Sequence, residues 1–323
     1  GVEFSTLGPL FRNVNLSAGA LLGASLLESE TPQEIGGTFT STDRNTDRSG
    51  RAGLTWTPNS LINFNIQGAL RRGVLNRPST IFGIGSAGDT TVAETVSTDA
   101  GNVNTSLRFN SPWGGTFSAT ARASDTQIIY DVETSRNNIN RSKNMQLQAQ
   151  DKILGAEVSW NFQNGVSESD FTQRQDGYVQ SQWNRNMELR TNRRLNRRTT
   201  TNLRGAISLN SRRFKDFRPS SPSSFPPADQ DLFRTSGAAG IDYRPWTKFT
   251  TGLEGQVDLN RSINLTSTTS INNTDQTGYR VIWTWTANPL PIWTVTQNNS
   301  AGANQIAYPF APDRDQLSFI YGL

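Results

Sequence analysis

A two-residue hydrophobic period recurs along almost the whole of this chain and limits what it can fold into. In residues 62–71, isoleucine, phenylalanine and leucine alternate with asparagine, glutamine and arginine. The same alternation returns in residues 103–110, 117–124, 145–150, 156–163, 202–209, 233–243, 249–259 and 279–287. Because successive side chains of a β-strand point to opposite faces, this period predicts strands with one apolar and one polar face. Arg185 and Ile282 are exceptions, since each falls on the face of the opposite character.

The alternating segments are longer than ordinary strands. They run for about nine to twelve residues, whereas a strand in a soluble protein has about five or six and a tilted membrane-spanning strand has about 9–11. Their polar side consists mostly of Asn, Gln, Ser, Thr and Arg, which is too polar for a second core. The pattern therefore favours antiparallel strands that cross a membrane, and a soluble β-sandwich or adhesin is the alternative.

Composition excludes several classes of function. The 323 residues contain neither Cys nor His, which removes disulfide scaffolds, Cys-containing zinc sites, thiol nucleophiles and imidazole-based triads. The net charge of +4 is spread along the chain without a basic block, so nucleic acid is not an expected partner. No enzyme activity, catalytic residue, cofactor or metal site is predicted. With 8 Trp, 16 Phe and 6 Tyr, the chain is too rich in aromatic residues for disorder.

Connections between the strands alternate between short and long. Short turns, most of them containing proline, are expected at residues 8–11, 57–60, 111–115, 151–155, 193–198, 244–247 and 288–291. Long polar stretches lie between these turns and predict loops, of which residues 73–100 form the longest. Counting the segments between these connections gives about fifteen strands.

Tryptophan gathers beside the short turns. Trp56 precedes Pro58, and Trp113 and Trp246 each follow a proline. Aromatic belts of this kind lie at membrane–water interfaces. The sequence therefore predicts a membrane-interface girdle at one end of the strands, formed by Trp56, Trp113, Trp246, Trp283, Trp285 and Trp293.

Long strands, alternating short and long connections and Trp-Pro turns together resemble the bacterial outer-membrane β-barrels, over essentially the whole chain. The final alternation of Leu317, Phe319, Tyr321 and Leu323 resembles the C-terminal strand signal of that class. The resemblance implies an all-β fold, a transmembrane antiparallel up-and-down β-barrel of about 14–16 strands with short periplasmic turns and long extracellular loops. It also implies that residues 1–323 form a single β-barrel domain in the bacterial cell outer membrane.

A second resemblance concerns the size of the barrel. The unit LTWTPNSLINFNIQGALRR, which joins two strands through a Trp-Pro turn, is similar to units of the very large SprA-type translocon barrels. If the short turns are periplasmic, the first strand runs inward like the last one, and the odd strand number departs from the even number of bacterial barrels. The 323 residues are therefore also interpreted as an incomplete segment of a longer barrel chain.

The polar face carries the residues from which a function is predicted. A lumen on this side is expected to be lined by Arg71, Arg108, Arg122, Arg190, Arg204, Arg234, Arg280, Glu254 and Asp258. Charged side chains that reach open water select ions in pores, whereas cross-strand ion pairs only hold the wall together. The leading hypothesis is an outer-membrane pore for passive or selective passage of small polar or anionic solutes. The alternatives are a segment of a SprA-like protein-translocation barrel and a structural anchor for a surface partner. The expected partners are outer-membrane lipid, further copies of the chain, or other cell-envelope proteins.

Overall fold

All fifteen strands of the protein belong to one antiparallel sheet, in which each strand pairs with its neighbours in sequence. The structure, a computed structural model, describes residues 2–11, 13–33, 37–81, 90–174, 176–222, 227–265, 270–290 and 292–322. The strands are β1 (Val2–Phe11), β2 (Val14–Gln33), β3 (Gly37–Asn59), β4 (Ile62–Ile81), β5 (Thr90–Asn110), β6 (Thr116–Tyr130), β7 (Asn138–Ile153), β8 (Ala156–Asp170), β9 (Gly177–Arg194), β10 (Thr199–Arg218), β11 (Gln230–Trp246), β12 (Phe249–Asn264), β13 (Thr274–Leu290), β14 (Trp293–Ala307) and β15 (Gln316–Gly322). Two short 3₁₀ turns, η1 (Thr134–Arg136) and η2 (Pro312–Arg314), lie in connections at the same end of the sheet.

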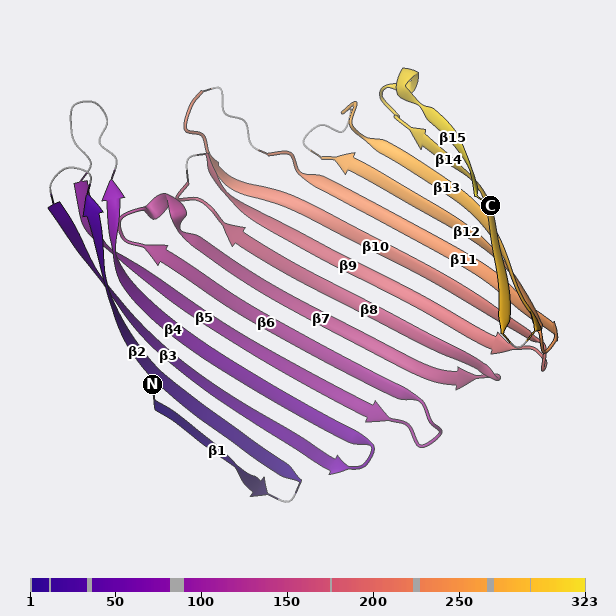
Figure 1. The fold of residues 1–323 in the computed structure, drawn as a ribbon, viewed down its shortest axis with the longest axis horizontal. Coiled ribbons are helices and arrows are strands. Elements are labelled where there is room, and N and C mark those ends of the chain that lie inside the picture. Colours follow the sequence, from indigo (N-terminus) through magenta and orange to yellow (C-terminus); the bar gives the residue numbers. More distant parts are fainter. Residues whose placement is uncertain are drawn as a thin grey trace.

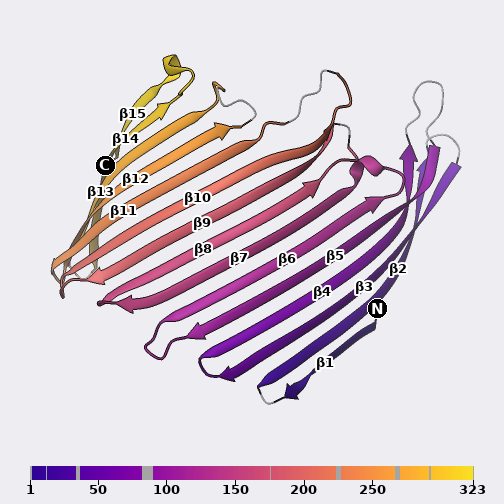
Figure 2. The same ribbon diagram turned by 180° about the vertical axis from the view of Figure 1, so that it is seen from behind.

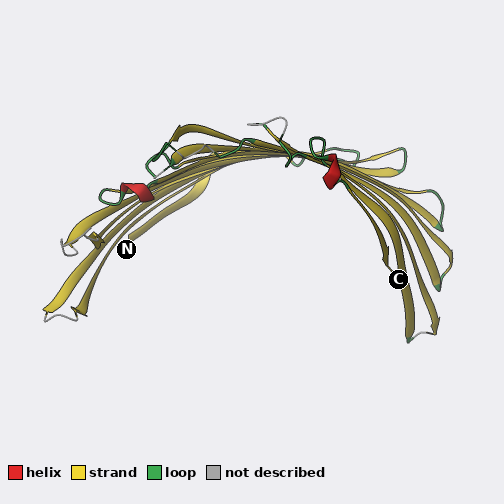
Figure 3. Cartoon of the chain, turned by 90° about the horizontal axis from the view of Figure 1, so that it is seen from above, coloured by secondary structure: helices red, strands yellow, loops and turns green. Residues whose placement is uncertain are grey.

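This architecture confirms the expected all-β, antiparallel, up-and-down fold. Figures 1 and 2 show the strands running obliquely and side by side in sequence order, with short turns at one end and longer connections at the other. Seen from above, the sheet curves into an arch, and its edge strands β1 and β15 do not meet (Figure 3). The barrel closure implied by the resemblance is therefore not present among the described strands. Within the described ranges, no helix is long and apolar enough to cross a membrane.

The register sorts the side chains onto the two faces as the alternation predicts. Leu253 of β12 lies opposite Ile241 of β11 and Trp283 of β13, so that three large apolar side chains form one row. The single-layer sheet has almost no interior, since Val96 and Ala311 are the buried hydrophobic residues of the described chain. The large apolar side chains of one face therefore remain uncovered by the protein itself.

The strands extend farther than the sequence indicates, which corrects the expected long loop at residues 73–100. β4 continues to Ile81, β5 starts at Thr90, and the two strands pair along this whole extension, from Ile81 opposite Thr90 to Gly73 opposite Thr98. In these outer parts both faces mix polar and apolar residues: Val74 and Leu75 are adjacent on β4, and Leu75 lies opposite the buried Val96. The hydrophobic period that identifies a strand is therefore lost, although the backbone ladder continues.

The first short turn also lies later than expected. Pro9, assigned to a turn at residues 8–11, pairs with Asn15 within the β1–β2 ladder. The chain reverses next to Asn13, whose φ of 67° lies in the left-handed region. Proline lacks an N–H donor and is tolerated on an edge strand such as β1, which explains why it did not end this strand.

The turn between β7 and β8 is a two-residue hairpin. Leu154 and Gly155 have φ values of 51° and 75°, and the flanking residues Ile153 and Ala156 form the last pair of the ladder. Positive φ at both central positions is the geometry of a type I′ turn, whose twist matches that of the strands. Glycine adopts this conformation without a steric penalty, whereas an L-residue such as Leu154 adopts it at a cost in free energy.

We expect Gly155→Ala to lower the free energy of unfolding by about 1–2 kcal/mol, because alanine is forced into the left-handed region. The matched control is Gly205→Ala, since Gly205 lies within β10 and an added Cβ there meets no atom within 4 Å. Reversible urea titration followed by tryptophan fluorescence measures both variants. Equal stabilities for the two would show that this turn does not need a glycine.

Candidate functional site

The apolar face ends in a row of aromatic side chains beside the short turns. Trp56 lies opposite Phe64 across β3 and β4. Farther along the sheet, Phe249 stacks between Trp246 and Trp285, with ring centroids 5.1 and 6.2 Å apart. These rings occupy the position predicted for the interfacial girdle.

The other tryptophans predicted for the girdle lie near the same end. Trp113 is exposed in the β5–β6 turn and donates its indole N–H to Asp151 Oδ2, near the end of β7, at 3.1 Å. Trp293 begins β14 opposite Leu290. Trp283 lies one row farther from the turns than Trp285, and its indole donates to the hydroxyl of Thr251 at 2.9 Å.

At the other end, the apolar face stops at a row of ion pairs, which the sequence reasoning missed. The pairs are Arg72–Asp99 at 3.5 Å, Arg141–Asp125 at 3.7 Å, Arg141–Glu168 at 3.6 Å, Arg213–Asp231 at 2.8 Å and Arg261–Asp275 at 2.6 Å. We call these nine residues the ion-pair row. These residues continue the alternation of the apolar face beyond its apolar residues, as Arg72 follows Leu70 and Arg261 follows Leu259. A charged residue that continues the apolar alternation was therefore the sequence signal for this row.

The two rows enclose an apolar band. On β12 the band runs from Phe249 to Leu259, and on β4 from Ile62 to Leu70. These lengths agree with the about 9–11 residues that a tilted strand needs to cross a hydrocarbon layer. Arg185 interrupts the band as expected, and Lys143 of β7 is a second basic residue on the same face.

The opposite, polar face carries a cluster of charges at the centre of the sheet. Arg190 and Arg204 lie directly opposite each other on β9 and β10. Glu188 lies between their guanidinium groups, with its Oε1 2.6 Å from Arg190 Nε and 2.9 Å from Arg204 Nε. One carboxylate thus offsets the repulsion between two cations that face each other across the ladder.

Polar hollows lie on either side of this cluster. A hollow of about 250 Å³ is lined by Gln148, Asn161, Glu188 and Arg190, among others. A second one, of about 380 Å³, is lined by Glu157, Asn202, Arg204 and Glu254, among others. A third, of about 470 Å³, lies over β12–β15 and includes Asp258, Gln276, Arg280 and Asn304. Each offers hydrogen-bond donors and acceptors to a polar solute.

All the predicted pore-lining residues share the polar face, but they differ in their partners. Arg71 makes a two-point contact with Asp47, through Nη2 at 2.7 Å and Nε at 3.0 Å. Arg108 donates to Asn110 and Arg280 to Ser300. Glu254 accepts a hydrogen bond from Gln256 at 2.7 Å. Within the described ranges, the side chains of Arg122, Arg234 and Asp258 make no ion pair or hydrogen bond.

These partners divide the arginines into two groups. Arg71, Arg190 and Arg204 pair with carboxylates, as expected of residues that hold the wall together. Arg122 and Arg234 keep an unneutralised charge on the polar face. The structure places Arg190, Arg204 and Glu254 around one pair of hollows, whereas Arg71, Arg108 and Arg122 lie apart on β4, β5 and β6.

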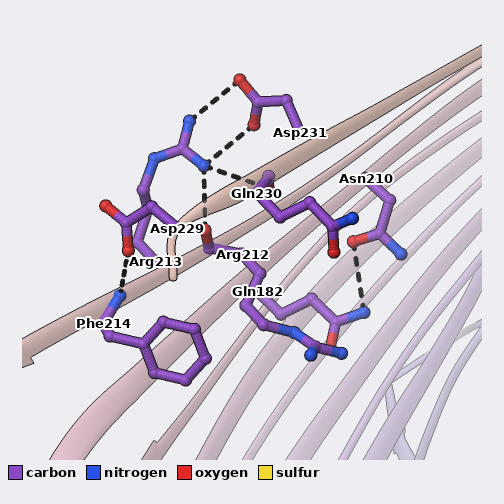
Figure 4. A network of polar contacts seen from close by, with 8 residues as sticks. All are labelled: Gln182, Asn210, Arg212, Arg213, Phe214, Asp229, Gln230 and Asp231. Atoms are coloured by element: carbon purple, nitrogen blue, oxygen red, sulfur yellow. Dashed lines mark hydrogen bonds and ion pairs between the residues drawn. The ribbon is translucent and has the colours of Figure 1, made fainter. Parts of the chain in front are cut away.

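A polar network ties β10 to β11 at the outer end of the sheet (Figure 4). The Arg213 guanidinium contacts Asp231 and donates to the backbone carbonyls of Arg212 and Gln230. Asp229 accepts the backbone N–H of Phe214 at 2.8 Å. Partial burial acts to raise the pKa of Asp231, but the hydrogen bonds from Arg213 and Ser211 outweigh it. The pKa of this carboxyl therefore lies below its ordinary value.

No protein-family model and no curated protein matches the chain. The alcaligin outer-membrane receptor FauA from Bordetella pertussis is similar in structure, with 10% sequence identity and a TM-score of 0.48. The match covers 99% of this chain and 53% of the receptor chain, so the chain spans about half the length of that protein.

We expect Glu188→Gln to lower the free energy of unfolding by about 0.5–1 kcal/mol, because it leaves Arg190 and Arg204 facing each other without a counterion. Glu254→Gln is the control, since Glu254 forms no ion pair within the described chain. Urea titrations at low and high salt measure both variants. The loss caused by Glu188→Gln should shrink at high salt because of screening; a loss that is independent of salt would contradict this origin.

The lowered pKa of Asp231 predicts a pH dependence of stability. A carboxyl whose folded pKa is below its unfolded one stabilises the fold above the unfolded pKa, and this contribution is lost as the pH falls through the folded value. We therefore expect unfolding midpoints to fall below about pH 4, and to fall less steeply in Asp231→Asn. Urea titrations from pH 6 down to pH 2 provide the measurement. Identical profiles for the two proteins would remove Asp231 as a contributor.

Proposed function

We propose that this protein forms the wall of a bacterial outer-membrane β-barrel, with the apolar band in lipid and the polar face toward an aqueous passage. The observation that carries the proposal is the apolar band itself, which lies between an aromatic row at the short turns and the ion-pair row at the other end. A soluble protein rarely leaves an apolar surface of this extent uncovered. Lipid would cover this face without any second layer of protein.

The passage would admit small polar or anionic solutes. Asn, Gln, Ser and Thr dominate the polar face, and its hollows present amide and carboxylate groups together with arginine. Arg122 and Arg234 supply positive charge that no carboxylate of the described chain neutralises. Charged side chains that reach water in this way favour ions of opposite sign in pores. We assign no catalytic role to any residue.

A wider barrel is the second candidate, and the sheet edges favour it. Because an odd number of up-and-down strands lies between them, β1 and β15 run parallel to each other. Closure by antiparallel pairing alone therefore needs an odd number of further strands between these edges. One such strand would give a barrel of ordinary size, whereas many would make this sheet one arc of a larger barrel, as in a translocon of SprA type or a barrel that anchors a surface partner.

The assignment of the two faces is tested by Leu253→Arg. Leu253 is 50% exposed within the apolar band, and we expect arginine there to cost about 2–4 kcal/mol of folding free energy in a bilayer. Ser236→Arg is the control, because Ser236 lies on the polar face opposite Asp258. Reversible folding titrations in lipid vesicles measure both variants. Equal costs would overturn the assignment.

The function is tested by conductance of the native protein in planar bilayers. The denaturing mass of the polypeptide recovered from membranes comes first, since a mass near 35.6 kDa indicates a pore built from this chain and a several-fold larger mass indicates the wide barrel. We expect a reversal potential that indicates a preference for anions. The double variant Arg122→Gln with Arg234→Gln should reduce this preference. Arg185→Gln, which lies on the other face, should leave it unchanged. Absence of conductance would support an anchor instead.

A further inference from the structure

A hollow of about 570 Å³ lies on the apolar face where β3, β4, β5 and β6 reach the ion-pair row. Its lining includes Arg48, Gly50, Leu70, Arg72 and two carboxylates, Asp99 and Asp125, of which Asp125 is 3.7 Å from Arg141. The register places these residues on one side of the sheet, in line with the apolar residues of β4. The hollow therefore straddles the boundary between the apolar band and the charged row.

Two glycines flank Leu70, and the Leu70 side chain lies over one of them, with its Cδ2 3.1 Å from the position of a Cβ added at Gly101. Leu70 lies between Gly50 of β3 and Gly101 of β5, so that its side chain has no neighbouring side chain in its row on either strand. It is 72% exposed, although it lies in the apolar band. A Cβ added at Gly50 would meet no atom within 4 Å, so the space beside Leu70 is open.

Two arginines face each other above this apolar floor. Arg48 of β3 is directly opposite Arg72 of β4, an arrangement in which like charges destabilise the ladder. Asp99 is 3.5 Å from Arg72 and half exposed, which makes a weak surface ion pair. Arg48 makes no ion pair or hydrogen bond within the described ranges. An anion placed between the two guanidinium groups would offset their repulsion.

We propose that this hollow binds the phosphate group of an anionic membrane lipid. Arginine matches the geometry of a phosphate through paired N–H donors, and two arginines can hold one group from both sides. The acyl chain would lie over Leu70 and continue toward Ala52 and Gly68, which are opposite each other one row farther into the band. Small side chains there leave room for it.

The apolar floor favours a lipid over free phosphate as the source of the group. A free phosphate would contact Arg48 and Arg72 but leave Leu70 uncovered, whereas a lipid satisfies the charged and the apolar part of the hollow together. The inference rests on the proposed position of the apolar band in a membrane. The inference adds a specific lipid-binding site, formed by β3, β4, β5 and β6, to that proposed position.

The test is native mass spectrometry of the detergent-solubilised protein titrated with phosphatidylglycerol or with phosphatidylcholine. We expect preferential binding of phosphatidylglycerol, weakened about tenfold in the double variant Arg48→Gln with Arg72→Gln. The control is Arg213→Gln with Arg261→Gln, which removes two arginines from the same row outside the hollow and should keep the preference. Equal weakening in both double variants, or none in either, would overturn the site.

A second variant probes the apolar part without changing any charge. Gly50→Leu fills the open space beside Leu70, and we expect it to weaken phosphatidylglycerol binding while the urea unfolding midpoint stays within error of the unmodified protein. Unchanged lipid binding in Gly50→Leu would overturn the proposed acyl-chain position.

Two further outcomes separate the possible failures. Binding of inorganic phosphate that depends on Arg48 and Arg72, without binding of phosphatidylglycerol, would assign the site to free phosphate and overturn the lipid. Recovery of the protein in the soluble fraction would overturn the proposed function and this inference together. A protein recovered from membranes that does not prefer phosphatidylglycerol overturns only the inference.

Discussion

A single-layer sheet has nothing of its own to cover an apolar face, and this constraint governs the whole structure. Rows such as Ile241, Leu253 and Trp283 gather large side chains on one side of the sheet, yet the described chain buries almost no hydrophobic residue. The hydrophobic effect that stabilises ordinary domains is therefore not satisfied within the protein. It can be satisfied only by an apolar environment outside the sheet, which is why the proposed function begins with lipid.

The borders of the apolar face follow from the same constraint. Tryptophan and phenylalanine beside the turns have apolar bodies, and the indole N–H groups of Trp113 and Trp283 still reach oxygen partners. At the other end, ion pairs such as Arg261–Asp275 bring charge onto the apolar face while keeping both groups neutralised. Beyond that row, pairing of β4 with β5 continues, although polar and apolar residues are mixed on both faces there. The change in side-chain chemistry thus marks where the apolar environment ends. The backbone ladder does not mark this boundary, because it continues past it.

The sequence was sufficient to predict the strand number, the antiparallel order and both faces, because each depends on a two-residue period that is visible locally. It did not predict the outer extensions of β4 and β5, where polar and apolar residues are mixed on both faces and the two-residue period is absent. It also placed the predicted arginines on one face without indicating their partners. The partners depend on the register between neighbouring strands, which the sequence of a single strand does not encode. Glu188 neutralises Arg190 and Arg204 for this reason, while Arg122 remains unpaired.

The edges of the sheet set the last requirement. Backbone N–H and C=O groups cannot remain unpaired in a hydrocarbon layer, so a sheet that crosses a membrane must have a partner strand along β1 and along β15. On β15, Phe319 lies in line with the apolar band through its partner Ala303, so this edge strand lies at membrane depth under the proposed function. Direct contact between the two edges would form a parallel ladder, whereas every ladder described is antiparallel.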